Sequence, residues 1–341
     1  SEDIDGYDKT QLKHQQFLFL IFVVSAHAIE VTISNNTLFV NNNPFYMKGI
    51  CYHPVEIGKT KRNFINLEED LLLMQEAGIN TVRVYEPIDD IAVLDQFKKA
   101  GIKVVISFGY NQQGKFDIVS GTFINYIRKY KNHDAILMWE LGNEYNYNPQ
   151  WFGGDINNWY KSMELVSQII QIEDPSRLVS SAHGDLPSKD ALKIASSINI
   201  WGMNVYRWDE PASIFEEWKK LSKKPMYFAE IGADSFMTKS TSKYDKGENQ
   251  QAQADANKKI ISEVLNNSDK NVGSFVFQFT DGLWKAGNPS EQDTGGSAPN
   301  SDGTPYDGTA NEEYWGIVDI NRNKKITFDV IKNSYTNFEV N

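Results

Sequence analysis

The feature that most constrains the fold of this chain is a regular alternation of short apolar runs with longer amphipathic stretches. The apolar runs have the length of strands and lie at Phe45–Ile50, Thr81–Tyr85, Val104–Phe108, Ile136–Trp139, Leu178–Ser181, Ile200–Tyr206, Met226–Ala229 and Gly273–Phe279. Stretches with a helical period alternate with them, including Leu67–Ala77, Ile91–Ala100, Phe123–Lys131, Ile156–Ile172, Ile214–Leu221, Gln250–Leu265 and Phe328–Tyr335. Eight strand–helix units predict an α/β fold of the (β/α)8 type, the TIM barrel, with its site at the C-terminal ends of the strands.

The region before these units has a different pattern. "EVTISNNTLFVNNNPFYMKGI" alternates around Asn-rich turns, which predicts an N-terminal β-hairpin leading into the first strand. Residues 1–28 contain a weakly basic lead, the apolar run Phe17–Val24 and an Ala26-x-Ala28 end, the layout of a secretory signal peptide. We therefore expect residues 1–28 to be a signal-peptide-like segment or an expression remnant, residues 29–341 to form a single domain, and the protein to be secreted.

Composition narrows the class of partner. The chain has 34 basic and 45 acidic side chains and a net charge of -11, without a stripe of Lys or Arg, so neither nucleic acid nor a membrane surface is an expected partner. Aromatic residues make up 13% of the chain, enough to provide stacking platforms as well as core. We found no His-Glu-x-x-His, CxxC or glycine-rich phosphate loop, so no metal and no cofactor are expected.

The segment "MWELGNEYN", residues 138–146, places two acids at the end of an apolar strand. At the C-terminal end of a barrel strand, Asn143 and Glu144 are expected to point into the mouth of the barrel. Glu140 lies deeper in the strand, where an unpaired charge is costly, so we expect it to be a structural acid paired with a basic or hydroxyl group.

A second acid has the same context. "KKPMYFAEIGAD" places Glu230 at the end of another apolar strand, three strands further along the chain. Two carboxyl groups that face one pocket are what a retaining glycosidase needs, one as acid and then base, the other as nucleophile at the anomeric carbon. The alternative is two buried acids that are each satisfied by an arginine.

These motifs resemble the retaining glycoside hydrolases of clan A, in which Asn-Glu ends strand four and a Glu ends strand seven. "NTVRVYEP", "PMYFAEIGAD" and "YWGIVDINRNKKITFDVIKN" are similar to segments of the family 72 β-1,3-glucanosyltransferases. "NNNPFYMKGICYHP" and "WGIVD" resemble the catalytic domains of family 2, which includes β-galactosidases and β-glucuronidases. The resemblance implies that Glu144 is the acid/base and Glu230 the nucleophile.

Roles for other residues follow from the same resemblance and from their places at strand ends. Arg83 would hold Glu230 ionised, Tyr206 would donate a hydrogen bond to it, and Asn143 would bind the sugar 2-OH. Trp284 is the expected floor for the sugar, because the apolar face of a pyranose packs on an aromatic ring. His53 and His183 are candidates for binding sugar hydroxyls or tuning a carboxylate. Other aromatic residues near strand ends that could line a cleft are Tyr52, Tyr85, Trp151, Trp208 and Trp315.

The sequence thus predicts a secreted retaining β-glycosidase that acts on an oligo- or polysaccharide, with β-1,3-linked glucan as the favoured substrate. Several alternatives stay open on the same barrel: a β-mannanase, an exo-acting β-glycosidase, a β-1,3-glucanosyltransferase, and a barrel that binds carbohydrate without cleaving it. Transfer and hydrolysis share one covalent intermediate and differ in whether a sugar hydroxyl or water captures it.

Overall fold

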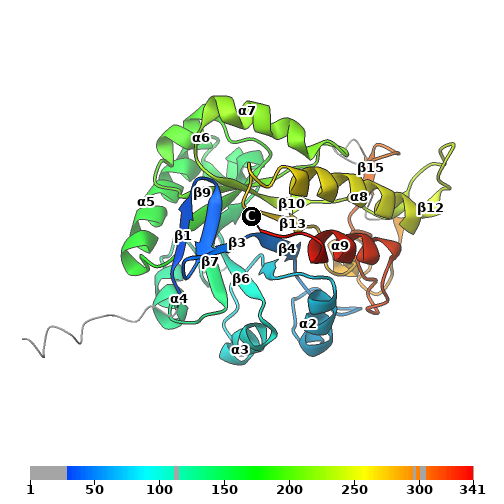
Figure 1. Cartoon of the computed structure of the whole chain (residues 1–341), viewed down its shortest axis with the longest axis horizontal. Helices are drawn as coiled ribbons and strands as arrows, with labels where there is room; N and C mark the ends of the chain where they lie inside the picture. Colours follow the sequence, from blue (N-terminus) through cyan, green and yellow to red (C-terminus); the bar gives the residue numbers. More distant parts are fainter. Residues whose placement is uncertain (1–28, 111–114, 295–296, 300–304, 341) are drawn as a thin grey trace, which may run out of the picture.

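The computed structural model confirms the eight-stranded barrel (Figure 1). It describes residues 29–110, 115–294, 297–299 and 305–340; the predicted signal-like segment 1–28 lies outside the described residues. All eight barrel strands run parallel, and the barrel closes where β13 pairs with β4. In order around the barrel they are β4 (Met47–Cys51), β5 (Thr81–Arg83), β6 (Lys103–Phe108), β7 (Ile136–Asn143), β8 (Val179–Gly184), β9 (Ile200–Asn204), β10 (Met226–Ile231) and β13 (Gly273–Val276).

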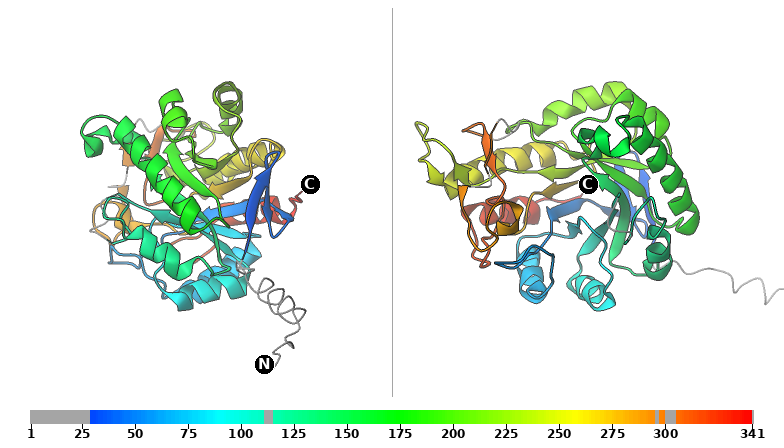
Figure 2. Two further views of the ribbon diagram at one scale, coloured as in Figure 1. Left: turned by 90° about the vertical axis from the view of Figure 1, so that its left-hand side faces the viewer. Right: turned by 180° about the vertical axis from the view of Figure 1, so that it is seen from behind.

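Helices surround the strands (Figures 1 and 2). They are α2 (Leu67–Glu76), α3 (Ile91–Ala100), α4 (Phe123–Tyr130), α5 (Asn157–Glu173), α6 (Lys189–Ile194), α7 (Ile214–Leu221), α8 (Gln250–Asn266) and α9 (Ile326–Thr336). The sequence pattern had located all of them except α6, which at six residues is too short to show a helical period.

Local signals fix where the helices begin and end. Helix α3 starts at Asp90, whose carboxylate accepts a hydrogen bond from the Ala92 amide, and it ends at Gly101 in the left-handed conformation. The Asn249 side chain caps α8 in the same way, through the Ala252 amide. The strands are buried along nearly their whole length, as expected when helices cover one face of a sheet and the barrel core the other.

A small antiparallel sheet precedes the barrel. It consists of β1 (Val31–Ser34), β2 (Thr37–Val40) and β3 (Asn43–Phe45), so the predicted hairpin has a third strand. The Val31 amide donates to the Ser176 carbonyl, just before the start of β8, which places this sheet at the N-terminal end of the barrel. Its apolar side chains join the core there, and the opposite end of the barrel remains available for a site.

The segment after β13, from Gly282 to Asn311, is rich in Gly, Asn, Ser and Asp. In its described part it forms a short 3-10 helix, η4 (Leu283–Lys285), and a two-stranded sheet of β14 (Ser297–Pro299) and β15 (Thr309–Asn311). A further small sheet pairs β11 (Phe236–Met237) with β12 (Gly247–Glu248). Among the described residues, we found no helix with the length and apolar character needed to cross a membrane.

Candidate active site

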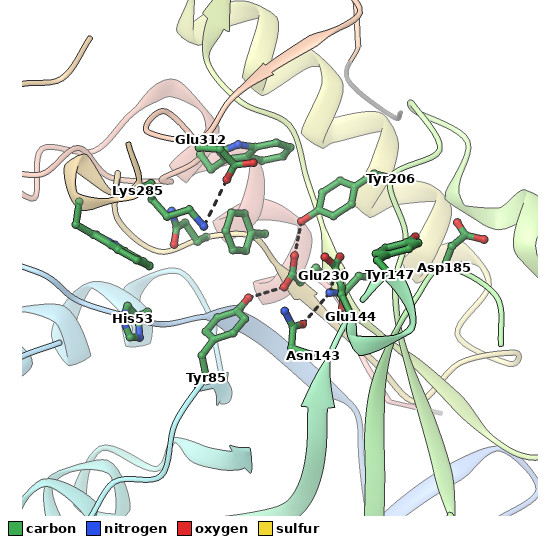
Figure 3. A pocket seen from close by; sticks show the side chains of 15 residues that line it. His53, Tyr85, Asn143, Glu144, Tyr147, Asp185, Tyr206, Glu230, Lys285 and Glu312 are labelled. Atoms are coloured by element: carbon green, nitrogen blue, oxygen red, sulfur yellow. Dashed lines mark hydrogen bonds and ion pairs between the residues drawn. The ribbon is translucent and has the colours of Figure 1, made fainter. Parts of the chain in front are cut away.

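A cavity of about 680 Å³ opens at the C-terminal ends of the barrel strands (Figure 3). Both predicted catalytic acids line it, together with residues from most of the surrounding strand ends and loops. Its lining consists of His53, Tyr85, Asn143, Glu144, Tyr147, Asp185, Asn204, Tyr206, Glu230, Phe277, Gln278, Trp284, Lys285, Glu312 and Trp315.

The backbone at the end of β7 explains how two consecutive residues reach the cavity. In a regular strand the side chains of Asn143 and Glu144 would point to opposite faces. Instead, the register of β7 against β8 shifts between Leu141 and Asn143, and Gly142 between them has a φ of 69°. A Cβ on Gly142 would lie 2.7 Å from the Trp159 ring. Glycine is therefore required there both for its positive φ and for lack of space for a side chain. Glu144 itself has a φ of 55°, in the left-handed region that only a few per cent of non-glycine residues adopt.

Glu230 is positioned by a similar irregularity in β10. The register of β10 against β9 shifts between Phe228 and Glu230, and the Glu230 side chain is only 8% exposed. Each of its carboxylate oxygens accepts a hydrogen bond from a tyrosine hydroxyl at 2.7 Å, Oε2 from Tyr85 and Oε1 from Tyr206 (Figure 3). These hydroxyls fix the carboxylate and stabilise its negative charge.

Arg83 lies behind Glu230 and connects the acids. It is fully buried, and its guanidinium donates to Glu230 at 3.1 Å, to Glu140 at 2.7 Å and to the Asn143 side-chain oxygen at 2.8 Å. Glu140 also accepts a hydrogen bond from the Tyr227 hydroxyl, so the predicted pairing of Glu140 with basic and hydroxyl groups is present. Because Arg83 is fully buried and does not line the cavity, it acts on the cavity through Glu230 and Asn143.

An amide network links Asn143 to Glu144. The Asn204 side-chain nitrogen donates to the Asn143 oxygen at 2.9 Å and to Glu144 Oε1 at 3.0 Å. The Asn143 oxygen therefore has two donors, Arg83 and Asn204, which assigns the orientation of the amide. Asn143 is left with its Nδ2 group as the donor for a ligand in the cavity.

Glu144 has the electrostatics of a general acid. Burial disfavours the charged carboxylate and the negative charge of Glu230 acts in the same direction, and together they raise the pKa of Glu144 to about 7. The hydrogen bond from Asn204 and the charge of Arg83 oppose this shift without cancelling it. Glu230, by contrast, is contacted by the guanidinium of Arg83 and by two tyrosine hydroxyl groups that donate to it. The two acids thus have opposite environments, as acid and nucleophile require.

Polar atoms on the cavity wall remain available to a ligand. Four buried side-chain atoms of the lining have no hydrogen-bond partner within the described part of the chain: His53 Nδ1, Asn204 Oδ1, Gln278 Nε2 and Trp315 Nε1. Burial, together with the charges of Arg62 and Lys285, lowers the pKa of His53 to about 3, so its ring is neutral. Unpaired buried polar atoms are costly, and sugar hydroxyl groups can satisfy both donors and acceptors.

Most of the predicted site residues converge on this cavity. Asn143, Tyr206, Trp284 and His53 line it with the two acids, and the rings of Trp284 and His53 lie 5.1 Å apart. Arg83 does not line it: it is fully buried beneath Glu230 and forms the expected ion pair with that carboxylate, so it is a positioning residue and not a substrate-binding one.

His183 also lies outside the cavity. Its side chain is buried, contacts the Tyr160 hydroxyl at 3.1 Å, and stacks against the Tyr160 ring, so it belongs to the packing between β8 and α5. The side chain at this strand position points to the helix layer, which strand periodicity without register could not reveal. Of the other candidate aromatics, Tyr85 and Trp315 line the cavity, whereas Tyr52 donates to Asp70 in the core and Trp151 and Trp208 lie outside the lining.

Several residues that line the cavity were not predicted from the sequence. Asn204 ends the apolar run "IWGMN", a polar residue at a strand end like Asn143, and this signal could have identified it. Gln278 similarly follows the apolar run "GSFVF". Tyr147, Asp185, Lys285 and Glu312 lie in the connections beyond the strand ends, the first and third of them in short 3-10 helices, and the hydrophobic pattern does not specify the paths of these connections.

Comparisons with known proteins agree with this geometry. Residues 31–288 match the family model of the glycosyl hydrolases family 2, TIM barrel domain. The chain is 23% identical over 266 residues to 1,3-beta-glucanosyltransferase GAS4 of Saccharomyces cerevisiae, covering 65% of this chain and 56% of that protein. It is 25% identical over 224 residues to the beta-glucuronidase of Mus musculus, covering 60% of this chain and 34% of that protein.

Solved structures show the same fold. A GH2 beta-galacturonidase from Eisenbergiella tayi bound to galacturonate superposes with a TM-score of 0.66 at 20% identity, over 92% of this chain and 54% of that one. The chain thus spans about half or less of the length of these relatives. Since the family model covers most of the chain, this protein belongs to the glycosyl hydrolases family 2 and contains the TIM barrel domain of that family.

Proposed function

We propose that this protein is a retaining β-glycosidase that cleaves a neutral β-glucan by double displacement, with Glu144 as acid/base and Glu230 as nucleophile. The observation that carries the proposal is the pair of carboxyl groups in one cavity with opposite electrostatic environments. Glu144 has its pKa raised to about 7, while Glu230 is contacted by Arg83, Tyr85 and Tyr206.

The two steps follow from these positions. In the first, the Glu230 carboxylate attacks the anomeric carbon and the bond to the leaving oxygen breaks, while that oxygen takes the proton of Glu144. In the second, Glu144, now a carboxylate, removes a proton from water, and the oxygen of that water attacks the anomeric carbon and releases Glu230. Asn143 is positioned to donate through Nδ2 to the sugar 2-OH, and Trp284 to pack against the ring.

A neutral sugar suits the charge of the cavity. Its lining contains four acids, Glu144, Glu230, Asp185 and Glu312, and a single lysine, Lys285. Lys285 is paired with Glu312, and the arginines that approach the lining, Arg83 and Arg207, are paired with Glu230 and Asp185. A substrate carboxylate would add negative charge to this surface. The glucuronidases among the relatives indicate the chemistry of the barrel, while this charge pattern favours a glucan, and the similarity to a 1,3-beta-glucanosyltransferase supports the β-1,3 linkage.

Transfer of the glycosyl group to another sugar is the second candidate. It rests on the similarity to the same relative, a 1,3-beta-glucanosyltransferase. In that case a sugar hydroxyl takes the place of water in the second step, and the residues and the covalent intermediate are unchanged.

Product analysis tests the proposal. The protein is incubated with β-1,3-glucan, mixed-linkage glucan, β-mannan and β-galactan oligosaccharides, and the products are identified by mass spectrometry. We expect shortened β-1,3-glucan oligomers from hydrolysis, or oligomers longer than the starting material from transfer. Cleavage of β-mannan alone would identify a mannanase instead. Binding without cleavage of any oligosaccharide would leave a carbohydrate-binding barrel and contradict the proposal.

A further inference from the structure

An ion pair forms part of the cavity wall. The Lys285 ammonium lies 3.4 Å from a carboxylate oxygen of Glu312 (Figure 3). Lys285 ends η4, after the last barrel strand, and Glu312 follows β15. The ammonium also lies over two aromatic rings, 5.1 Å from the centre of Phe277 and 5.4 Å from that of Trp284. Its position is therefore set by one carboxylate and two aromatic faces.

The backbone that carries Glu312 is anchored on both sides. Asn311 and Glu313 are both fully buried. The Asn311 amide donates to Asp234 at 3.0 Å, its side chain donates to the Asp293 carbonyl at 3.1 Å, and Glu313 accepts from the Asp293 amide at 3.1 Å. Glu312 is thus held beside Lys285 by residues that cannot move without breaking buried hydrogen bonds.

The ion pair faces the sugar that is transferred. In Figure 3, Tyr147 and Asp185 lie on the Glu144 side of Glu230, and Lys285 and Glu312 lie on the other side. Because the acid protonates the leaving oxygen, the Glu144 side accommodates the leaving group. The opposite side, where Lys285 and Glu312 join Trp284 and His53, is then left for the substituents of the sugar that becomes attached to Glu230.

Lys285 is the one lysine or arginine in the described cavity lining, and His53 is neutral. A uronic acid would need this ammonium as the partner of its carboxylate, but Glu312 already occupies it. We propose that Glu312 is a specificity-determining residue: by neutralising Lys285 it excludes uronic acids and selects neutral sugars. The inference rests on the proposed function for the location of the sugar, and it predicts that removing the Glu312 charge frees Lys285 to accept a uronate.

Four proteins test this: the wild type, Glu312→Gln, Lys285→Met, and the double variant. For each, binding of D-glucuronate and D-glucose is measured by ligand-observed NMR at about pH 6, where glucuronate is ionised. The values of kcat/KM for 4-nitrophenyl β-glucuronide and β-glucoside are measured in parallel. We expect Glu312→Gln to raise the affinity for glucuronate relative to glucose by at least about tenfold, the effect of one freed charge at a partly exposed site. The double variant should not show this gain, because it lacks the ammonium.

The controls separate this inference from the proposed function. If no variant cleaves either glycoside or β-1,3-glucan oligosaccharides, the proposed function fails, and the binding ratios still decide the role of Glu312. Three results would overturn the inference. The ratio of glucuronate to glucose affinity could be unchanged in Glu312→Gln, this variant could show no detectable binding of glucuronate, or the double variant could gain as much affinity for glucuronate as Glu312→Gln. A wild-type preference for glucuronate would overturn it as well. Glu312 is partly exposed, so its substitution should leave the thermal unfolding temperature nearly unchanged, and Glu312→Ala provides a second variant at the same position.

Discussion

The guanidinium of Arg83 donates to Glu230 across 3.1 Å, and the arginine is completely buried whereas the glutamate reaches the cavity. The same guanidinium donates to Glu140 and Asn143, so one planar group orients two strand ends. Arg83 does not touch the cavity, and its contribution to the proposed reaction is the position and charge of groups that do.

Arg83→Lys tests this positioning role. A lysine keeps the charge but cannot supply three directed hydrogen bonds to Glu140, Glu230 and Asn143 together. Loss of one bond to a charged group, at about 1.5–3 kcal/mol, should lower kcat/KM by about 10- to 100-fold. A purely structural role would instead lower the unfolding temperature and leave the pH dependence of the remaining activity unchanged, so both are measured.

The two acids can be told apart by chemical rescue. In Glu230→Gly, added azide should attack the anomeric carbon from the vacated nucleophile position and give the α-glycosyl azide. In Glu144→Ala, azide should capture the covalent intermediate from the opposite face and give the β-glycosyl azide. NMR identifies the anomer of each product. The same anomer from both variants would contradict the assignment of roles.

The pH dependence follows from Glu144. Its pKa is raised to about 7, first by burial and then by the charge of Glu230, and the proposed first step needs its proton. We expect kcat/KM to fall as pH rises through about 7, because the carboxylate cannot protonate the leaving oxygen. Glu144→Gln should lose this limb of the profile and should slow poor leaving groups more than activated aryl glycosides. If the fall in kcat/KM above about pH 7 persists in Glu144→Gln, another titrating group must cause it.

Trp284→Ala should weaken substrate use with little effect on folding. The indole lines the cavity beside His53 and Lys285, and removal of a sugar-stacking surface should raise KM by roughly 10-fold, on the order of 1–1.5 kcal/mol. Trp151 is a matched control, because it is about half exposed and does not line the cavity. Equal effects of Trp284→Ala and Trp151→Ala would contradict the proposed stacking role, and a large loss of thermal stability would return Trp284 to the core.

We expect His183 to contribute to the loss of folding stability at acidic pH. Burial lowers its pKa to about 4, whereas in the unfolded chain an imidazole gains a proton near pH 6.5. As pH falls between these values, the unfolded state binds the additional proton, so the free energy of unfolding should fall by up to about 1.4 kcal/mol per pH unit. His183→Gln should remove this contribution to the slope, as measured by denaturant unfolding at several pH values. An identical slope in the variant would show that the histidine is already protonated in the folded state.

The fold could be predicted because hydrophobic periodicity is a local property of the sequence. Each buried strand and each amphipathic helix of sufficient length has a recognisable hydrophobic period in the sequence. Among the described helices around the barrel, only α6 is too short to show one. The acids Glu144 and Glu230 were found because a charged residue at the end of an apolar strand is unusual by itself. The single-cysteine chain gave no disulfide to constrain the topology, so the prediction depended on this periodicity alone.

The remaining parts of the site depend on geometry that no local pattern encodes. The register shift at Gly142 and the left-handed conformation of Glu144 together bring Asn143 and Glu144 into one cavity, whereas regular alternation would have separated them. His183 was misplaced because its neighbours across the barrel decide which way it points. Lys285 and Glu312 are 27 positions apart in the sequence, and only the tertiary structure shows that they form an ion pair.

The most direct test of the account is to trap the covalent intermediate. The protein is incubated with an activated 2-deoxy-2-fluoroglucoside, whose fluorine slows release of the sugar, and is then digested and analysed by tandem mass spectrometry. We predict a single added fluoroglucosyl group on the peptide that contains Glu230, and no adduct in Glu230→Gln. An adduct on another residue, or turnover with inversion at the anomeric carbon and no adduct, would contradict the central claim that Glu230 is the nucleophile of a retaining glycosidase.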